Sequence, residues 1–120
     1  MNRHPDFVPN GVIPAVLLPF EDDFSIDEKG FQAHLADVCA VDGLSAITLN
    51  AHSTEVGSCT FEEQQRVLAL ALDAVGERMP IVNGVYAEGS FEAAKIARMA
   101  SDMGASALLV FPPGPFTMGH

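Results

Sequence analysis

The chain has 120 residues, of which 48% are hydrophobic and 18% charged, a composition that suits one globular domain with a modest core. Its 6 Lys and Arg residues against 16 Asp and Glu residues give a formal net charge of -10, which repels a phosphate backbone, so we expect no nucleic-acid partner. No apolar run has the length of a membrane span and the N-terminus lacks the pattern of a signal peptide, so we expect a cytoplasmic protein without membrane attachment.

The first predicted element follows a proline-containing leader at residues 1–10. The stretch GVIPAVLLPF at 11–20 is short and almost continuously apolar, which is typical of a strand buried on both faces. Because proline cannot donate a hydrogen bond to a sheet, Pro14 has to lie near the start of this strand or on an unpaired side. We therefore predict a strand at 12–18.

The first helix is predicted from a capping box. Ser25 is followed three residues later by Glu28, so the serine hydroxyl can accept from an orphan backbone N–H while the glutamate reaches back. Phe31 and Leu35 then begin an apolar stripe with helical spacing, and Gly43 is a stop signal. The pattern predicts a helix that begins at the capping box and ends at this glycine.

The order of strand, capping signal and amphipathic helix is repeated twice in the rest of the chain. The repeats predict a strand at 45–50, a helix from the Thr60–Glu63 capping box to Gly76, a strand at 80–84, a helix from Ser90 to Gly104 and a strand at 107–111.

The predicted order β-α-β-α-β-α-β indicates an α/β fold with a parallel sheet, since each helix returns the chain to the same end of the sheet. An open doubly wound sheet and part of a (β/α)8 TIM barrel both fit this order, and a complete barrel takes about 250 residues. The first strand-to-helix loop has acidic residues and no GxGxxG pattern, which argues against a dinucleotide site. No helix follows the fourth strand, so we expect residues 11–120 to be a truncated first half of a barrel, with strands 1 to 4 and helices 1 to 3.

The side chains that commonly bind metals are scattered along the sequence. Cys39 and Cys59 form no CxxC pair, and we expect free buried thiols rather than a disulfide. The histidines show neither HxH nor HxxxH spacing, so we predict no metal site and no cofactor. They are His4, His34, His52 and His120.

Three motifs occur in a consistent order and spacing, namely GVIPAVLLPF at 11–20, LNAHSTE at 49–55 and PIVNGV at 80–85. With the continuation SCTFEEQQRVLALALDAVGERM between the last two, they resemble the dihydrodipicolinate synthase and N-acetylneuraminate lyase family of class I aldolases, from Gly11 to Phe111. The resemblance implies a (β/α)8 barrel in which a lysine late in the barrel forms a Schiff base with a 2-oxo acid, usually pyruvate. It also implies a homo-oligomer, commonly a tetramer.

The resemblance places a carboxylate-binding loop at Ala51-His52-Ser53-Thr54-Glu55, which matches the family motif G-[ST]-T-G-E. In the family this loop binds the pyruvate carboxylate through backbone N–H groups and a hydroxyl, and the hydroxyl position is Ser53. His52 stands where the family has Ser or Thr, and it adds a ring that can donate a hydrogen bond to an anion. Ala51 and Thr54 replace glycines, so a turn that needs positive φ there would be strained. The resemblance implies substrate contacts from Ser53, His52, Thr54 and Ala15, and it places Gly84 at the end of the third strand. Glu55 is a candidate general base, but acceptors in turns commonly bond backbone N–H groups, so the structural role in the loop is the one we expect.

The Schiff-base lysine is implied to lie beyond residue 120, so no catalytic residue is assigned within the chain. Lys29 and Lys95 are the only lysines, and each falls on a predicted helix, where we expect solvent-exposed side chains. After the fourth strand the family often has P-Y-Y, whose second tyrosine takes part in a proton relay. This chain has Pro-Pro-Gly at 112–114, which leaves only Phe116 to fill that space, without the hydroxyl.

Two functions of different class remain open. The first is a lyase or aldolase that acts on a 2-oxo acid, with its lysine outside this segment. The second is a catalytically inactive half-barrel that binds a ligand or pairs its open sheet edges with another copy of itself.

Overall fold

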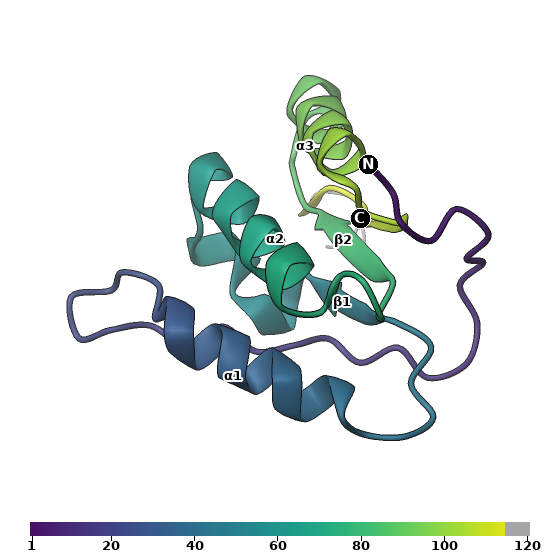
Figure 1. The fold of residues 1–120 in the computed structure, drawn as a ribbon. Coiled ribbons are helices and arrows are strands. Elements are labelled where there is room, and N and C mark those ends of the chain that lie inside the picture. Colours follow the sequence, from purple (N-terminus) through teal and green to yellow (C-terminus); the bar gives the residue numbers. More distant parts are fainter. Residues whose placement is uncertain (115–120) are drawn as a thin grey trace.

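The computed structural model describes residues 1–114, in which helices alternate with short strands (Figure 1). In chain order the elements are α1 (Glu28–Cys39), β1 (Ile47–Leu49), the 3-10 turns η1 (His52–Thr54) and η2 (Val56–Ser58), α2 (Phe61–Val75), β2 (Ile81–Val85), α3 (Ser90–Met103) and β3 (Ala107–Val110).

The strands form one parallel sheet in the order β1-β2-β3. In its register, Ile47 of β1 lies beside Ile81 of β2, and Val82 of β2 lies beside Ala107 of β3. The alternation of parallel strands with helices confirms the predicted α/β fold. The predicted strands at 45–50, 80–84 and 107–111 are present at these places with slightly different ends.

The first apolar segment, at 11–20, lies beside β1 without becoming a regular strand. Val16 N donates to Thr48 O at 2.9 Å and Thr48 N donates to Pro14 O at 2.8 Å, so the two backbones run in parallel. Pro14 has no N–H to continue the ladder, and only isolated bridges form. The prediction of a regular strand at 12–18 is therefore wrong, although the segment occupies the expected edge of the sheet.

The first helix has a different cap from the predicted one. The carboxylate of Asp27 accepts from Gly30 N at 2.9 Å, and α1 begins at Glu28. Ser25 lies outside the helix, where its hydroxyl donates to Asp23 at 2.6 Å. The predicted Ser25–Glu28 capping box is wrong because an aspartate closer to the helix caps it, and because the serine already has an acidic partner in the loop.

The other helix signals agree more closely with the structure. Thr60 Oγ1 accepts from Glu63 N at 3.0 Å and Thr60 N donates to Glu63 Oε1 at 2.9 Å, which confirms the second capping box. Gly104 follows α3 with a φ of 114°, as expected for a helix-ending glycine. At the end of α1 the helix stops at Cys39, earlier than the predicted Gly43.

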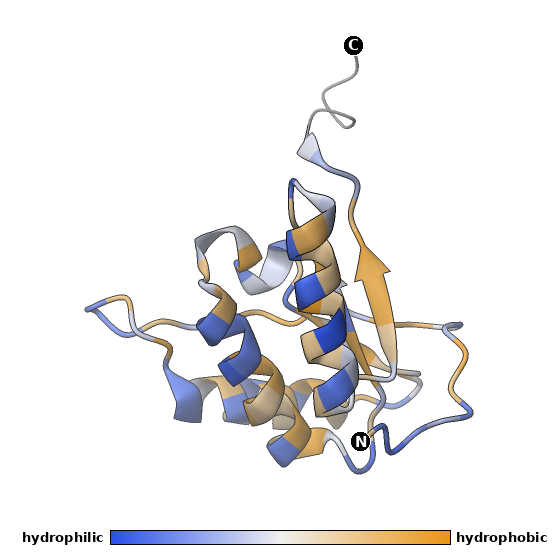
Figure 2. Cartoon of the chain, turned by 90° about the horizontal axis from the view of Figure 1, so that it is seen from above, coloured by the Kyte–Doolittle hydropathy of each residue, from blue (hydrophilic) through white to orange (hydrophobic). Residues whose placement is uncertain are grey.

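The helices cover one face of the sheet (Figure 1). Ile47 and Leu49 of β1 and Ile81 and Val85 of β2 are part of one buried cluster with the apolar faces of the helices. Figure 2 shows this pattern by hydropathy, with orange strands and with helices that carry both orange and blue residues. The helices contribute Phe31, Leu35, Val67, Leu68, Leu70, Ala71, Val75, Ile96, Met99 and Ala100 to the cluster.

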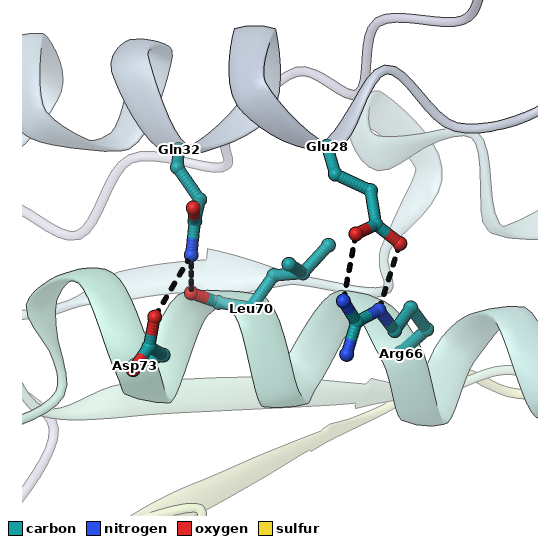
Figure 3. Close-up of polar contacts among 5 residues, drawn as sticks. All are labelled: Glu28, Gln32, Arg66, Leu70 and Asp73. Atoms are coloured by element: carbon teal, nitrogen blue, oxygen red, sulfur yellow. Dashed lines mark hydrogen bonds and ion pairs between the residues drawn. The ribbon is translucent and has the colours of Figure 1, made fainter.

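Polar side chains join α1 to α2 at the surface (Figure 3). Glu28 receives two hydrogen bonds from Arg66, both at 2.7 Å, and this contact holds the pKa of the glutamate below its ordinary value. One turn further along α1, Gln32 Nε2 donates to Leu70 O at 3.1 Å and to Asp73 Oδ2 at 3.2 Å. These contacts connect the first two helices at the surface, above the apolar residues that pack between them.

Asn2 and His4 of the N-terminal segment contact the edge where the strands begin. Asn2 Oδ1 accepts from the Ser106 hydroxyl at 2.8 Å, just before β3. His4 Nε2 lies 2.8 Å from Gly76 O, just after α2, and donates to it because a carbonyl can only accept. Among residues 1–114, no helix combines the length and the apolar character that a membrane crossing requires.

Candidate functional site

The candidate site lies at the carboxyl edge of the sheet, where parallel strands bring their following residues together. His52 follows β1, Tyr86 follows β2 and Phe111 follows β3. His52 and Phe111 line a pocket of about 250 Å³. It is lined by Ile13, Ala15, Thr48, Ala51, His52, Ser53, Leu109 and Phe111.

The backbone of the loop after β1 takes positive φ at its two ends. Asn50 has a φ of 54° and Glu55 a φ of 61°, both in the left-handed region. Ala51 has a φ of -119°, and Thr54 is also outside the positive-φ region. The two residues that replace the family's glycines therefore avoid this strain, and the left-handed conformation falls on Asn50 and Glu55 instead. Of these two, asparagine is the residue type that adopts it more readily.

Two contacts hold this loop against the sheet. The Thr54 side chain is buried, and its hydroxyl donates to Val16 O at 2.7 Å. Gly84 of β2 lies so close to the loop that a Cβ at this position would collide with the carbonyl oxygen of Asn50. The structure therefore places Thr54 outside the pocket lining, at an anchor between the loop and the first segment, while Gly84 permits the close approach of β2.

His52 is exposed at the mouth of the pocket and is part of a cluster of three rings. Its imidazole stacks on Phe111, with a centroid distance of 4.4 Å and an interplanar angle of 27°. Tyr86 meets the same imidazole edge-on, at 5.3 Å and 80°. Such stacked and T-shaped pairs stabilise the orientation of the rings. The sequence did not reveal this cluster, because Tyr86 and Phe111 follow different strands.

Hydroxyl groups supply the polar part of the pocket. Ser53 lines it from η1 and Thr48 from the middle of β1, and neither hydroxyl has a hydrogen-bond partner among residues 1–114. Thr48 was not predicted, although a threonine inside an otherwise apolar strand is a signal for the face turned away from the core. Ala15 lines the pocket from the first segment and leaves room beside these two hydroxyls.

Donors in this arrangement suit a small anion. The backbone N–H groups of His52 and Ser53 have no acceptor in the described part of the chain, because the turn's hydrogen bonds begin with Thr54 N to Ala51 O at 3.0 Å. A carboxylate is stabilised where hydroxyl and backbone donors are available to it. Unpaired hydroxyl and backbone donors, the kinds of group that bind an anion, therefore belong to residues that line the pocket.

Glu55 lies beyond the pocket. Its backbone N–H donates to His52 O at 3.0 Å and its carbonyl oxygen accepts from Ser58 N at 2.9 Å, so it connects the two 3-10 turns. The residue lines a separate hollow of about 410 Å³, together with Leu18, Phe20, Phe24 and Ser58. The structure therefore separates this residue from the hydroxyls of Ser53 and Thr48.

The two lysines lie on helices and not in the pocket. Lys29 is exposed on α1. Lys95 is exposed on α3, where its Nζ lies 4.1 Å from the centroid of the Phe61 ring and 3.8 Å from Glu92 Oε1. Neither position brings an amine to the candidate site.

Other groups that carry chemistry are also remote from the pocket. Cys39 and Cys59 are free and half-buried, and burial raises the pKa of both thiols. Within residues 1–114, no group of three or more His, Cys, Asp or Glu side chains could hold a metal ion. Phe116, the residue considered for the relay position, lies outside the described residues.

Comparison with known proteins identifies relatives over almost the whole chain. Residues 8–116 match the model of the dihydrodipicolinate synthetase family. The 4-hydroxy-tetrahydrodipicolinate synthase of Agrobacterium fabrum is 34% identical over 103 residues, which are 86% of this chain and 35% of that protein. The enzyme of the same name from Salinibacter ruber is 34% identical over 108 residues, 90% of this chain and 35% of that protein. The chain thus spans about a third of the length of the curated relatives it matches.

Solved structures share the arrangement of sheet and helices. A dihydrodipicolinate synthase family protein from Coccidioides immitis has a TM-score of 0.80 at 27% identity, over 87% of this chain and 34% of that chain. The 4-hydroxy-tetrahydrodipicolinate synthase of Methylacidiphilum fumariolicum SolV has a TM-score of 0.82 at 22% identity, over 88% of this chain and 35% of that chain, a likeness of fold. The described elements therefore form part of a (β/α)8 barrel. The chain belongs to the dihydrodipicolinate synthetase family.

Proposed function

We propose that the protein that carries this chain is a lyase of the aldolase type that acts on pyruvate or a related 2-oxo acid, and that this chain binds the substrate carboxylate. The observation that carries the proposal is the pocket at the carboxyl edge of the sheet, with the unpaired hydroxyls of Ser53 and Thr48 in its lining. Family membership supports the class of reaction. The edge of the sheet supports the location, because barrel enzymes bind their substrates there.

The chemistry requires a lysine from outside this chain. A neutral lysine amine attacks the substrate carbonyl, water leaves, and the resulting iminium withdraws electrons from the neighbouring carbon, where a carbon–carbon bond can form or break. Lys29 and Lys95 are exposed on helices away from the pocket. This chain would therefore hold the carboxylate end of the substrate while another part of the protein supplies the amine.

His52 is proposed to contact the same substrate. Its ring lines the pocket and is held by Phe111 and Tyr86, so it presents a fixed donor or acceptor at the mouth. An imidazole there can donate a hydrogen bond to an anionic substrate. Thr54 is not part of this proposal, because its buried hydroxyl already bonds Val16 O.

The proposal includes a cytoplasmic homo-oligomer, with no nucleic-acid partner. Its support is the family resemblance and the net charge of -10. Analytical ultracentrifugation of the protein encoded by the whole gene tests this part, and a single monomeric species would contradict it.

Borohydride trapping tests the proposed reaction. Pyruvate and borohydride are added to the protein encoded by the whole gene, and the labelled residue is located by mass spectrometry. We expect one labelled lysine, and neither Lys29 nor Lys95. A protein that remains unlabelled, or one labelled at either of these two lysines, contradicts the proposal.

A second candidate function is a catalytically inactive half-barrel that pairs with another copy. The observation in its favour is the apolar edge strand β3, in which Leu108, Leu109 and Val110 are 40%, 42% and 64% exposed. Exposed apolar strand edges favour association. A dimer of the gene-encoded protein that takes up no label from pyruvate and borohydride would favour this candidate.

A further inference from the structure

Two buried asparagines lie directly beneath the loop that carries His52 and Ser53. Asn50 Nδ2 donates to Asn83 Oδ1 at 2.9 Å and to Gln64 O at 3.0 Å. Asn83 Nδ2 in turn donates to Gly84 O at 3.0 Å. One side chain therefore connects the start of the loop to α2 and to β2.

These amides are shielded from water. Asn50 is 1% exposed and Asn83 is 0% exposed. A buried amide is costly unless it is hydrogen-bonded, so removing either partner leaves the other without its bond. The pair therefore specifies one arrangement of the loop start more strongly than an apolar contact of the same size would.

The backbone of Asn50 is where the chain changes direction. Its φ of 54° ends the extended course of β1, and its carbonyl oxygen packs against Gly84. At the far end of the loop, Thr54 bonds Val16 O. His52 and Ser53 thus lie between two fixed points, one of which is the asparagine pair.

We propose that Asn50 and Asn83 are positioning residues, which hold the loop at 51–55 so that Ser53 faces the substrate carboxylate. This inference rests on the proposed function for the identity of the ligand. The orientation of the loop itself rests on the amide contacts. Neither asparagine lines the pocket, so both act through the backbone that they hold.

Asn50→Gly is the most informative change. Glycine adopts positive φ without strain, so the backbone conformation is retained while the side-chain amide is lost. Asn83→Ala removes the other partner, and one folded variant of the two is sufficient. Because both changes break the same contact, their effects in the double variant should be clearly less than additive.

Gln64→Leu is the matched control. Asn50 uses only the backbone oxygen of Gln64, and the side-chain Oε1 of this glutamine is buried without a hydrogen-bond partner. Leucine has a similar size and leaves the backbone acceptor in place. The control therefore changes a buried residue at the same location and keeps the proposed positioning contact.

Two measurements on the protein encoded by the whole gene test the proposal. Amide hydrogen exchange reports the loop directly, and we expect the amides of Thr54, Glu55 and Val56 to exchange at least about tenfold faster in Asn50→Gly than in Gln64→Leu. The dissociation constant for pyruvate should rise on the order of tenfold in Asn50→Gly and stay unchanged in Gln64→Leu.

The outcomes separate the two proposals. If the unsubstituted protein does not bind pyruvate but Asn50→Gly still shows faster exchange, the positioning role is retained and the proposed substrate is rejected. Wild-type exchange at residues 51–55 in both Asn50→Gly and Asn83→Ala would overturn the positioning role. Equal weakening of pyruvate binding by Gln64→Leu would overturn it as well, because the effect would then be general to this part of the core.

Discussion

The two faces of the sheet differ in burial: one packs against the helices as an apolar core, and the other is partly exposed and lines pockets. On the face toward the helices, Leu49 of β1 is fully buried in a continuous apolar cluster. On the other face, Leu109 of β3 is partly exposed and lines two pockets, together with the hydroxyl-bearing Thr48. Alternation along each strand thus separates residues that build the core from residues that line the candidate site. The most stabilising residues and the proposed functional residues are therefore neighbours in sequence.

Truncation of matched leucines gives the largest expected difference between the faces. We expect Leu49→Ala to lower the free energy of unfolding by about 2 to 5 kcal/mol, because it leaves a cavity in a packed cluster. Leu109→Ala should cost about 1 kcal/mol or less, because the side chain is already in contact with water. Urea denaturation of the 120-residue chain measures both. Equal losses would show that the second face is also a packed core.

Glycine substitution tests how closely β2 approaches the loop. A Cβ at Gly84 would collide with the Asn50 carbonyl oxygen, so Gly84→Ala should destabilise the chain by about 1 to 3 kcal/mol. Gly57 is the matched control, since a Cβ there meets nothing within 4 Å, and Gly57→Ala should change stability by about 0.5 kcal/mol or less. The urea midpoints of the two variants measure this difference. A Gly84→Ala variant with unchanged stability would argue against the tight contact between β2 and the loop.

The loss of stability in acid that comes from the Glu28–Arg66 pair between α1 and α2 is a smaller effect. Hydrogen bonds from Arg66 lower the pKa of Glu28 from its ordinary value of 4.5, so the unfolded chain binds the proton more readily than the folded chain. The stability from this pair is fully present above pH 4.5 and is lost as the pH falls through the lowered pKa of the folded state. Glu28→Gln should therefore lose less stability between about pH 7 and about pH 3 than the unsubstituted chain.

The control for this pH measurement is Glu77→Gln, since Glu77 forms no ion pair among residues 1–114. Urea midpoints at both pH values give the comparison. A Glu28→Gln variant with the same acid response as the unsubstituted chain and the control would contradict the role of Arg66.

Thiol reactivity gives the smallest expected effect. Burial raises the pKa of Cys39 and Cys59, which keeps both thiols protonated near neutral pH and slows alkylation. Iodoacetamide should modify them more slowly in the folded chain than in urea. Both thiols should react completely in urea, because both are free. Equal rates in the two conditions would contradict the half-buried placement.

Most of the fold could be predicted because its signals are local. The capping box at Thr60 and Glu63 lies within one turn of sequence, and each strand is a short, mostly apolar run that follows a helical pattern. Two local signals gave wrong predictions, one for the first strand and one for the cap of α1. Pro14 looked compatible with a strand start, but the missing N–H falls where the ladder to β1 needs a donor. Ser25 looked like a cap, but its hydroxyl bonds Asp23 and Asp27 caps the helix instead.

Less of the candidate site could be predicted, because it depends on which strands become neighbours. Ser53 and His52 were found through the motif that follows one strand, and the structure places both at the pocket. Tyr86 and Phe111 meet His52 only because β1, β2 and β3 are adjacent in the sheet. The sequence motif pointed to Ala51 and Thr54 as the positions where positive φ would cause strain, whereas the structure has positive φ at Asn50 and Glu55.

The most direct test of the proposed carboxylate site is the dissociation constant for pyruvate after Ser53→Ala, measured by calorimetry on the protein encoded by the whole gene. Ser58→Ala is the control, since Ser58 is also exposed but lines the separate hollow beside Glu55. Loss of a hydrogen bond to a charged group costs about 1.5 to 3 kcal/mol, so we expect binding to weaken on the order of tenfold to a hundredfold for Ser53→Ala, with no change for Ser58→Ala. A Ser53→Ala protein that binds pyruvate as tightly as the unsubstituted protein would contradict the assignment of this loop as the carboxylate site.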